Sequence, residues 1–203
     1  MTKVTGLRCV SCGKVYSPGE LDYTCPACGR RRGTLEVLYD YELAGKEFKE
    51  KITGESLGDI KRYLPLLPIE NLDNLPPLRI GGTPLYGFHE LTDKLDRVWI
   101  KDDSGNPTAS YKDRASALAI AAARQKKIET MTCASTGNAA SSLAGLAAAS
   151  GMKTAIFVPA AAPEAKITQL LVYGANVFAV NGNYDQAYDL CLEAAEEYNW
   201  YNR

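Results

Sequence analysis

The second half of the chain alternates between short apolar runs and longer stretches of strong helix formers. The apolar runs predict four strands, at residues 97–101, 130–134, 154–158 and 177–180. The other stretches predict four helices, at residues 111–126, 139–150, 163–173 and 184–198. Because strands and helices alternate, the pattern indicates βαβ units, a parallel sheet with right-handed crossovers, and an α/β fold. No strand is predicted after the last helix, so we expect the sheet to be incomplete at residue 203.

The first 95 residues follow a different pattern. Residues 1–40 contain two cysteine pairs and form a first module, and residues 41–95 form a connecting arm that leads into the larger domain at 96–203. A short helix is predicted at 46–52, and the prolines after it prevent long helices. Gly81-Gly82-Thr83-Pro84-Leu85 predicts a turn followed by an extended segment, and its local chemistry favours a plain connector.

The four cysteines of the first module are spaced as two pairs. Each pair has two intervening residues, and a glycine follows its second cysteine. Such turns let backbone N–H groups point at a thiolate, and two of them make a zinc ribbon with tetrahedral coordination. The ligands would be Cys9, Cys12, Cys25 and Cys28. Four thiolates leave no position for water, so the zinc would be structural; two disulfides are the alternative.

Composition narrows the class of protein. Of the 203 residues, 46% are apolar, and the formal net charge of −1 argues against a nucleic-acid scaffold with a broad basic surface. No apolar run reaches membrane-spanning length, and the N-terminus lacks the apolar core of a signal peptide. We therefore expect a cytoplasmic protein that binds neither membranes nor nucleic acid. Cys133 and Cys191 stand alone in apolar segments and are expected to be buried free thiols.

One lysine lies where a polar loop gives way to a predicted helix. Lys112 comes directly after the loop 104–111 and is followed by Asp113 and Arg114. A desolvated lysine near the positive end of a helix favours the neutral amine, which Schiff-base formation with an aldehyde cofactor requires. The alternative is an ordinary exposed helix lysine, with Asp113 and Arg114 as polar residues of the helix start.

A second loop, Ser135-Thr136-Gly137-Asn138, lies between a predicted strand and a predicted helix. In open α/β sheets, ligands bind outside the carboxyl ends of strands, and hydroxyls, a glycine and successive N–H groups there suit a carboxylate or phosphate. The Asn138 amide can also hydrogen-bond a phenolic oxygen of a cofactor. Helix capping explains these residues equally well. His89, the only histidine, has no catalytic context, and no GxGxxG fingerprint is present.

Taken together, these segments resemble the threonine synthases and, more broadly, the fold-type-II pyridoxal-phosphate enzymes of the tryptophan synthase β-like group. The similarity covers essentially the whole chain. The matching segments, in family order, are Cys9/Cys12/Cys25/Cys28, Gly82-Thr83-Pro84-Leu85, Lys101-Asp102-Asp103, Asn106-Pro107-Thr108-Ala109-Ser110-Tyr111-Lys112-Asp113-Arg114, Ser135-Thr136-Gly137-Asn138-Ala139 and Gly182-Asn183-Tyr184-Asp185. Ala109 and Tyr111 stand where the family usually has Gly and Phe.

The resemblance implies a role for each segment. Lys112 would bind pyridoxal phosphate as a Schiff base and later move protons, and Asn138 would hydrogen-bond the ring oxygen of the cofactor. The substrate α-carboxylate would be held by Ser135, Thr136, Gly137, Asn138 and Ala139. The implied reaction, catalysed by a lyase of threonine biosynthesis, converts O-phospho-L-homoserine and water to L-threonine and phosphate.

Two family features have no counterpart in this sequence: the later glycine-rich loop for the cofactor phosphate and the partner of the pyridine nitrogen. We therefore expect the N-terminal portion of such an enzyme, with an incomplete large domain and no activity of its own. Cysteate synthase and threonine dehydratase are alternatives within the superfamily. A non-catalytic zinc-ribbon binding module, with Arg30-Arg31-Arg32 as a basic patch, is an alternative of another class. The oligomeric state is left open, with a homodimer as one option.

Overall fold

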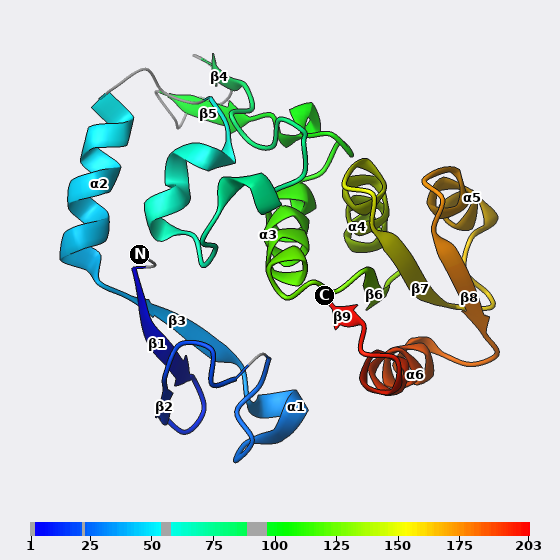
Figure 1. The fold of residues 1–203 in the computed structure, drawn as a ribbon. Helices are drawn as coiled ribbons and strands as arrows, with labels where there is room; N and C mark the ends of the chain where they lie inside the picture. The colour runs from blue at the N-terminus through cyan, green and yellow to red at the C-terminus, as the bar shows by residue number, and fades with distance from the viewer. Residues whose placement is uncertain (1–2, 22, 54–57, 89–96) are drawn as a thin grey trace. The chain divides into compact units, whose positions relative to one another are not determined.

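The computed structural model describes residues 3–21, 23–53, 58–88 and 97–203 (Figure 1). The single histidine, His89, lies outside the described residues. The chain divides into two units, of which the first comprises Met1–Leu57 and Lys61–Glu70, and the second Gly58–Ile60 and Asn71–Arg203. Within the described ranges, no helix is both long and apolar enough to cross a bilayer.

A three-stranded antiparallel sheet organises the first unit. Its strands are β1 (Val4–Cys9), β2 (Val15–Tyr16) and β3 (Leu35–Tyr39), in the order β2-β1-β3. Leu7 of β1 lies opposite Tyr16 on one side and Val37 on the other. The core of this small sheet is made by cysteines as much as by aliphatic residues: Cys9, Tyr16 and Cys25 are buried, with Leu7, Leu21, Cys28 and Leu35 packed against them.

Two helices flank β3 in the first unit. The single-turn helix α1 (Gly29–Arg32) precedes β3, and α2 (Tyr41–Thr53) follows it. α2 begins earlier than the helix predicted at 46–52, because Asp40 caps its start: its Oδ1 accepts a hydrogen bond from the Leu43 N–H at 2.9 Å. Short 3-10 helices span Ile60–Leu66 and Leu72–Asn74.

The second unit contains a parallel sheet in the order β8-β7-β6-β9. Its strands are β6 (Thr130–Ala134), β7 (Lys153–Pro159), β8 (Asn176–Val180) and β9 (Tyr201–Asn202). The helices around them are α3 (Lys112–Gln125), α4 (Asn138–Ala149), α5 (Glu164–Val172) and α6 (Tyr184–Glu197). The predicted α/β fold, with its parallel sheet and four helices, is confirmed.

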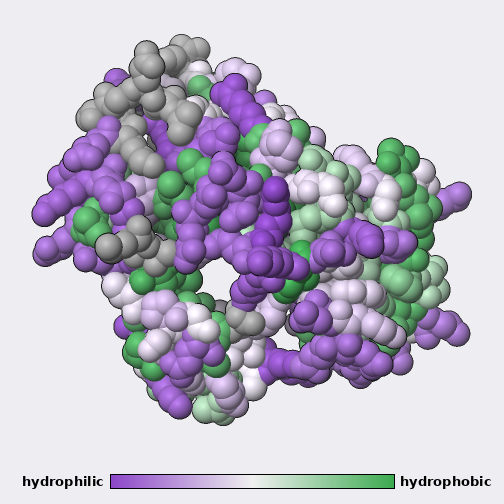
Figure 2. Space-filling view, in the orientation of Figure 1, coloured by the Kyte–Doolittle hydropathy of each residue, from purple (hydrophilic) through white to green (hydrophobic). Residues whose placement is uncertain are grey.

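Helices cover both faces of the central strand. Ala155 and Phe157 of β7 pack against Ala187 and Cys191 of α6. The intervening residues of β7 are buried as well, and Figure 1 shows α4 and α5 on the side of the sheet away from α6. Burial on both faces explains why β7 is a continuous apolar run. The sheet is more open at β8: Phe178 of β8 and Leu171 and Val172 of the neighbouring α5 are exposed. Figure 2 shows hydrophobic surface on this side of the molecule.

The first predicted strand of the α/β region has a different partner from the one expected. β5 (Val98–Lys101) lies outside the parallel sheet and pairs antiparallel with β4 (Leu85–Phe88), with Tyr86 opposite Ile100. Gly87 lies opposite Trp99, and a Cβ on Gly87 would come within 3.0 Å of the indole. The expectation that this strand belongs to a βαβ unit was therefore wrong, because a strand pattern does not specify which strand lies beside it.

The chain also forms a strand after its last long helix, contrary to expectation. Beyond α6 the backbone turns at Asn199, whose φ is 51°, and β9 then pairs parallel with β6. Asparagine adopts this left-handed conformation more readily than most residues. A strand of two residues is too short to show periodicity, and for that reason the sequence pattern did not predict it.

Two helical glycines, one in each unit, differ in the space around them. A Cβ on Gly145 of α4 would lie 2.8 Å from the methyl group of Thr108, whereas a Cβ on Gly45 of α2 would meet nothing within 4 Å. Rotation of the Thr108 side chain away from Gly145 would break the hydrogen bond that its hydroxyl donates to Asp113. We expect Gly145→Ala to lower the free energy of unfolding by about 1–2 kcal/mol through overpacking.

Gly45→Ala is the matched control for this prediction. It should raise the free energy of unfolding by about 1 kcal/mol, because alanine is the better helix former and no neighbour obstructs it. Urea unfolding of both variants, followed by far-ultraviolet circular dichroism, measures the two effects. An equal gain in both variants would show that α4 does not press on the loop that contains Thr108.

Candidate functional site

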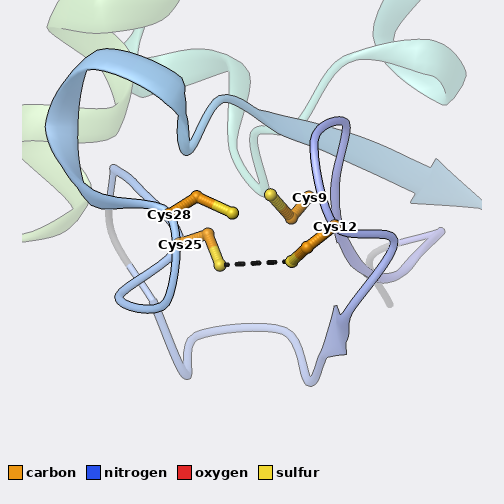
Figure 3. Close-up of side chains that lie close together, drawn as sticks. All are labelled: Cys9, Cys12, Cys25 and Cys28. Carbon is orange, nitrogen blue, oxygen red and sulfur yellow. Dashed lines mark hydrogen bonds between the residues drawn. The ribbon is translucent and has the colours of Figure 1, made fainter.

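Four cysteine sulfurs converge in the first unit. The sulfurs of Cys9, Cys12, Cys25 and Cys28 all lie within 4.8 Å of one another (Figure 3). They come from two turns whose glycines, Gly13 and Gly29, have φ values of 74° and 69°. All four thiols are free, and the Cys12 and Cys25 sulfurs are 3.7 Å apart, well beyond a bond length of about 2.05 Å. The four sulfurs are placed where they could hold a metal ion.

Hydrogen bonds give the thiols of this cluster different pKa values. The buried Tyr16 hydroxyl lies 3.0 Å from the Cys25 sulfur, and this bond, helped by backbone N–H groups of Cys28 and Ala27, lowers the pKa of Cys25 to about 6. The Cys28 thiol shares a hydrogen bond with Cys12 and is partly desolvated, which raises its pKa to about 12. Thiols this close cannot all ionise without a compensating cation, and four sulfur ligands suit tetrahedral Zn²⁺.

In the second unit, Lys112 is the first residue of α3. Its N–H donates to the Ser110 hydroxyl at 3.2 Å, and its Nζ lies 4.6 Å from the centre of the exposed Tyr111 ring. The lysine is half-buried, and no ion pair of its amine is seen among the described residues. An amine held at a helix start with no carboxylate partner is available for reaction with a carbonyl group.

Asp113 points inward and fixes the loop that precedes the helix. Its side chain is completely buried, and its carboxylate accepts hydrogen bonds from the N–H of Thr108, at 2.7 Å, and from the Thr108 hydroxyl. The loop folds back to make these bonds, and Ala109 takes a φ of 56° within it. Asp113 is therefore not the simple polar residue of a helix start that the sequence suggested.

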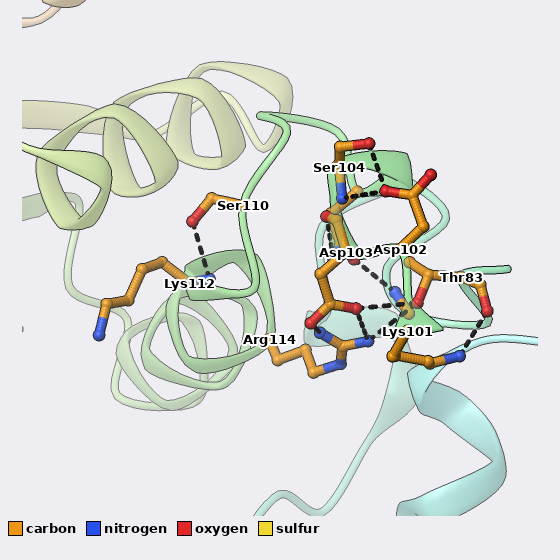
Figure 4. Close-up of polar contacts among 10 residues, drawn as sticks. Thr83, Lys101, Asp102, Asp103, Ser104, Ser110, Lys112 and Arg114 are labelled. Carbon is orange, nitrogen blue, oxygen red and sulfur yellow. Dashed lines mark hydrogen bonds and ion pairs between the residues drawn. The ribbon is translucent and has the colours of Figure 1, made fainter. Parts of the chain in front are cut away.

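Arg114 points away from Lys112 and binds a second acidic residue (Figure 4). Its two terminal nitrogens donate to the two carboxylate oxygens of Asp103, at 2.7 and 2.8 Å. Thr83 donates to the same carboxylate at 2.8 Å. The bond from Arg114 is the main reason that the pKa of Asp103 lies below its usual range. Arg114, too, is more than a polar residue of the helix start.

The Gly81-Gly82-Thr83-Pro84 segment is docked rather than a plain connector. The Gly81 N–H donates to the side chain of the buried Asn106 at 2.9 Å, and Lys101 donates to the Thr83 carbonyl oxygen. Gly81 and Gly82 have φ values of 77° and 60°, and a Cβ on Gly82 would collide with the carbonyl oxygen of Gly58. Two successive glycines before Thr-Pro were the available sequence signal for this close approach.

Ser135-Thr136-Gly137-Asn138 joins β6 to α4, as predicted. Gly137 occupies the N-cap position, so no side chain caps the helix, and the Gly137 N–H itself donates to the Ser135 hydroxyl at 3.1 Å. A Cβ on Gly137 would meet nothing within 4 Å, and Asn138 is exposed. Side-chain capping of the helix therefore does not explain these polar residues. The space beside Gly137 is open, and the N–H groups of a helix start suit an anion.

α3 and α4 run side by side in the same direction. Their C-terminal ends meet at one groove, which Arg124 and Lys127 line together with Gly151 and Met152. Nearer their starts, the Ser142 hydroxyl donates to that of Ser116 at 2.6 Å in the buried interface. Ser116 follows Lys112 by about one helical turn, and Ser142 follows Asn138 by the same interval.

Both helices start at the carboxyl edge of the parallel sheet. α4 follows the carboxyl end of β6 directly. Arg203 follows β9. Its backbone N–H donates to the Thr132 carbonyl oxygen at 2.9 Å, and its guanidinium donates to the Lys112 carbonyl oxygen at 3.5 Å. The structure thus brings the candidate lysine and the candidate anion loop, Ser135–Asn138, to the edge of the sheet where α/β proteins bind ligands.

Comparison with known proteins assigns the chain to a family. Residues 77–203 match the family model described as "Pyridoxal-phosphate dependent enzyme". The chain belongs to this family. It is 39% identical to a threonine synthase of Methanocaldococcus jannaschii over 94% of this chain and 47% of that protein. It is 37% identical to a threonine synthase of Methanosarcina acetivorans, over 89% of this chain and 44% of that protein. The chain thus spans about half the length of these curated relatives.

Solved structures share the fold of this pyridoxal-phosphate family member. An O-ureido-L-serine synthase superposes with a TM-score of 0.55 and 24% identity, covering 66% of this chain and 44% of that one. A diaminopropionate ammonia lyase from Escherichia coli superposes with a TM-score of 0.54 and 18% identity, covering 88% of this chain and 43% of that one. These likenesses support the tryptophan synthase β-like architecture.

The residues present fit an aldehyde cofactor and an anionic substrate group. The chain offers an amine at the start of α3, the exposed residue Asn138, and a start of α4 that no side chain caps, with open space beside Gly137. Cys133 and Cys191 are buried and free, as predicted, and burial raises the pKa of Cys133 to about 12, so its thiol stays neutral.

The left-handed backbone at Ala109 gives a testable prediction for this loop. An L-residue there costs about 1–2 kcal/mol, whereas glycine costs about 0.5–1 kcal/mol in lost chain entropy. Ala109→Gly should therefore raise the free energy of unfolding in urea by about 0.5–1 kcal/mol. The same change at the exposed Ala115, inside α3, should lower it by about 1 kcal/mol. Losses at both positions would mean that Ala109 is not strained.

Proposed function

We propose that this chain supplies the lysine and the substrate-carboxylate loop of a threonine synthase. The reaction would convert O-phospho-L-homoserine and water to L-threonine and phosphate. The observation that carries the proposal is that Lys112 and the uncapped start of α4 lie at one edge of the sheet. Identities of 37–39% to threonine synthases over about nine-tenths of the chain support this choice of substrate.

Each site residue has a defined task in this proposal. The Lys112 amine binds the cofactor aldehyde and afterwards carries protons at its Nζ. Residues Ser135, Thr136, Gly137, Asn138 and Ala139 hold the substrate α-carboxylate through hydroxyls and backbone N–H groups at the start of α4. Asn138 donates its amide to the ring oxygen of the cofactor. Bound pyridoxal phosphate supplies the electron sink for substrate carbanions.

Residues 1–203 contain no counterpart of the glycine-rich loop that the family resemblance assigns to the cofactor phosphate. The proposal therefore assigns that loop, and the contact to the pyridine nitrogen, to a segment equivalent to the unmatched half of the longer relatives. We expect the 203-residue chain alone to bind pyridoxal phosphate weakly and to turn over no substrate.

Covalent trapping tests the role of Lys112. The chain is incubated with pyridoxal phosphate and reduced with borohydride, and the modified peptide is identified by mass spectrometry. We expect the main adduct on Lys112, its loss in Lys112→Ala, and its retention in Lys166→Ala, which removes an exposed lysine of α5. Adducts spread evenly over the lysines would contradict a preorganised site.

Product analysis tests the choice of substrate. A protein that joins this chain to a C-terminal half like those of its relatives should release threonine and phosphate from O-phospho-L-homoserine. Lys112→Ala should abolish that release. A product other than threonine, such as cysteate or an oxoacid, would favour another member of the superfamily, cysteate synthase or threonine dehydratase, over our proposal.

We further propose that Cys9, Cys12, Cys25 and Cys28 bind a structural Zn²⁺. The supporting observation is the convergence of four free sulfurs, two of them buried, in a unit with a small apolar core. Metal binding would then contribute directly to the folding of that unit. Four sulfur ligands leave no position for a substrate or for water, so this ion would take no part in the reaction.

Tyr16→Phe tests the proposed zinc site with little change in shape. Loss of the hydroxyl that contacts Cys25 should weaken zinc retention about tenfold, the lower end of effects seen for residues that hydrogen-bond metal ligands. Competition with a chromogenic chelator measures the affinity. Tyr39→Phe on β3 is the matched control and should leave it unchanged, whereas Cys9→Ser should release the ion. Unchanged zinc content in Cys9→Ser would rule out the four-thiolate site.

A further inference from the structure

We propose that Asp103 and Arg114 form a clamp that fixes the rotation of the first turn of α3 and thereby positions Lys112. Both are positioning residues, because neither is placed against the substrate or the cofactor. The inference rests on the proposed function of Lys112. It goes beyond that function by naming the contact that holds the lysine in place.

The contact between Arg114 and Asp103 is more closely defined in geometry than an ordinary surface ion pair. Arg114 donates through two parallel hydrogen bonds to Asp103, which begins a 3-10 helix (Asp103–Gly105) just after β5. A planar guanidinium in two-point contact with a carboxylate fixes direction as well as distance. Each side chain is only about one-third exposed, and Thr83 donates to the same carboxylate. The clamp therefore joins α3 to two other segments of the second unit.

The helical spacing explains how the clamp acts on a residue it does not touch. Successive residues of an α-helix are about 100° apart, so Arg114 lies about 200° around the axis from Lys112. Figure 4 shows the two side chains leaving the helix in different directions. Between them, the buried Asp113 holds the loop at Thr108. With Asp113 and Arg114 both fixed, the first turn cannot rotate, and the Lys112 side chain has one direction of exit.

Electrostatics supplies a second reason for the pairing. A cation in the first turn of a helix is unfavourable, because the exposed N–H groups already make that end positive. Asp103 neutralises Arg114 there, and its own pKa lies below the usual range, so it stays ionised at neutral pH.

Asp103→Asn is the variant that tests the clamp, since it keeps the shape of the side chain and removes its charge. We expect amide hydrogen exchange in residues 110–116 to become about tenfold faster, in the chain without cofactor. We expect the borohydride-trapped adduct on Lys112 to fall by about tenfold, because reactivity depends steeply on placement. Thr83→Val should have a smaller effect in the same direction, and Thr83→Ser, which retains the hydroxyl, should restore both readouts.

The control is Glu36→Gln in the first unit. It removes an exposed two-point contact in which both donor nitrogens of Arg8 bind Glu36 Oε2, and it should change neither readout. Unchanged exchange and unchanged trapping in Asp103→Asn would overturn the clamp. If the unmodified chain itself gives no adduct on Lys112, the proposed function fails. The exchange measurement then still decides whether Asp103 holds the first turn of α3.

Discussion

A buried carboxylate at the start of a helix governs the arrangement of this site. Asp113 is completely enclosed, and a polar group in such a place is tolerated only if it is hydrogen-bonded. Thr108 provides the donors, from its N–H and its hydroxyl, and the loop must double back to deliver them. The left-handed backbone at Ala109 follows from that path, as does the close approach of Thr108 to Gly145 on α4.

The consequences of this constraint extend to the neighbouring residues. Because Asp113 points inward, Lys112 and Arg114 on either side of it must leave the helix in other directions. Arg114 binds Asp103. The Lys112 amine lies over the Tyr111 ring and makes no ion pair among the described residues. The Lys-Asp-Arg segment thus divides three tasks among consecutive residues: presenting an amine, closing the loop, and joining the helix to the Thr83 segment.

The two units are stabilised by different physical means. In the second, a parallel sheet is buried on both faces by alanine-rich helices, and apolar burial supplies most of the stabilisation. In the first, a sheet with one two-residue strand has a core whose buried members include Cys9 and Cys25. A unit with so small a core generally needs a metal or disulfides, and its thiols are free and convergent.

The sequence by itself determined the α/β class, the helices and main strands of the second unit, and the spacing of the four cysteines, because each is written in local periodicity or in short motifs. It also placed Lys112 and Ser135–Asn138 at helix starts. Only the tertiary structure decided that β5 pairs with β4, that β9 joins β6, and that Gly81-Gly82-Thr83-Pro84 docks onto Asn106 and Asp103. These contacts join residues far apart in the chain, and their energies depend on distances that no local pattern encodes. The same is true of Asp113 and Arg114. The sequence shows that these residues are charged, but only the structure shows that they bind Thr108 and Asp103.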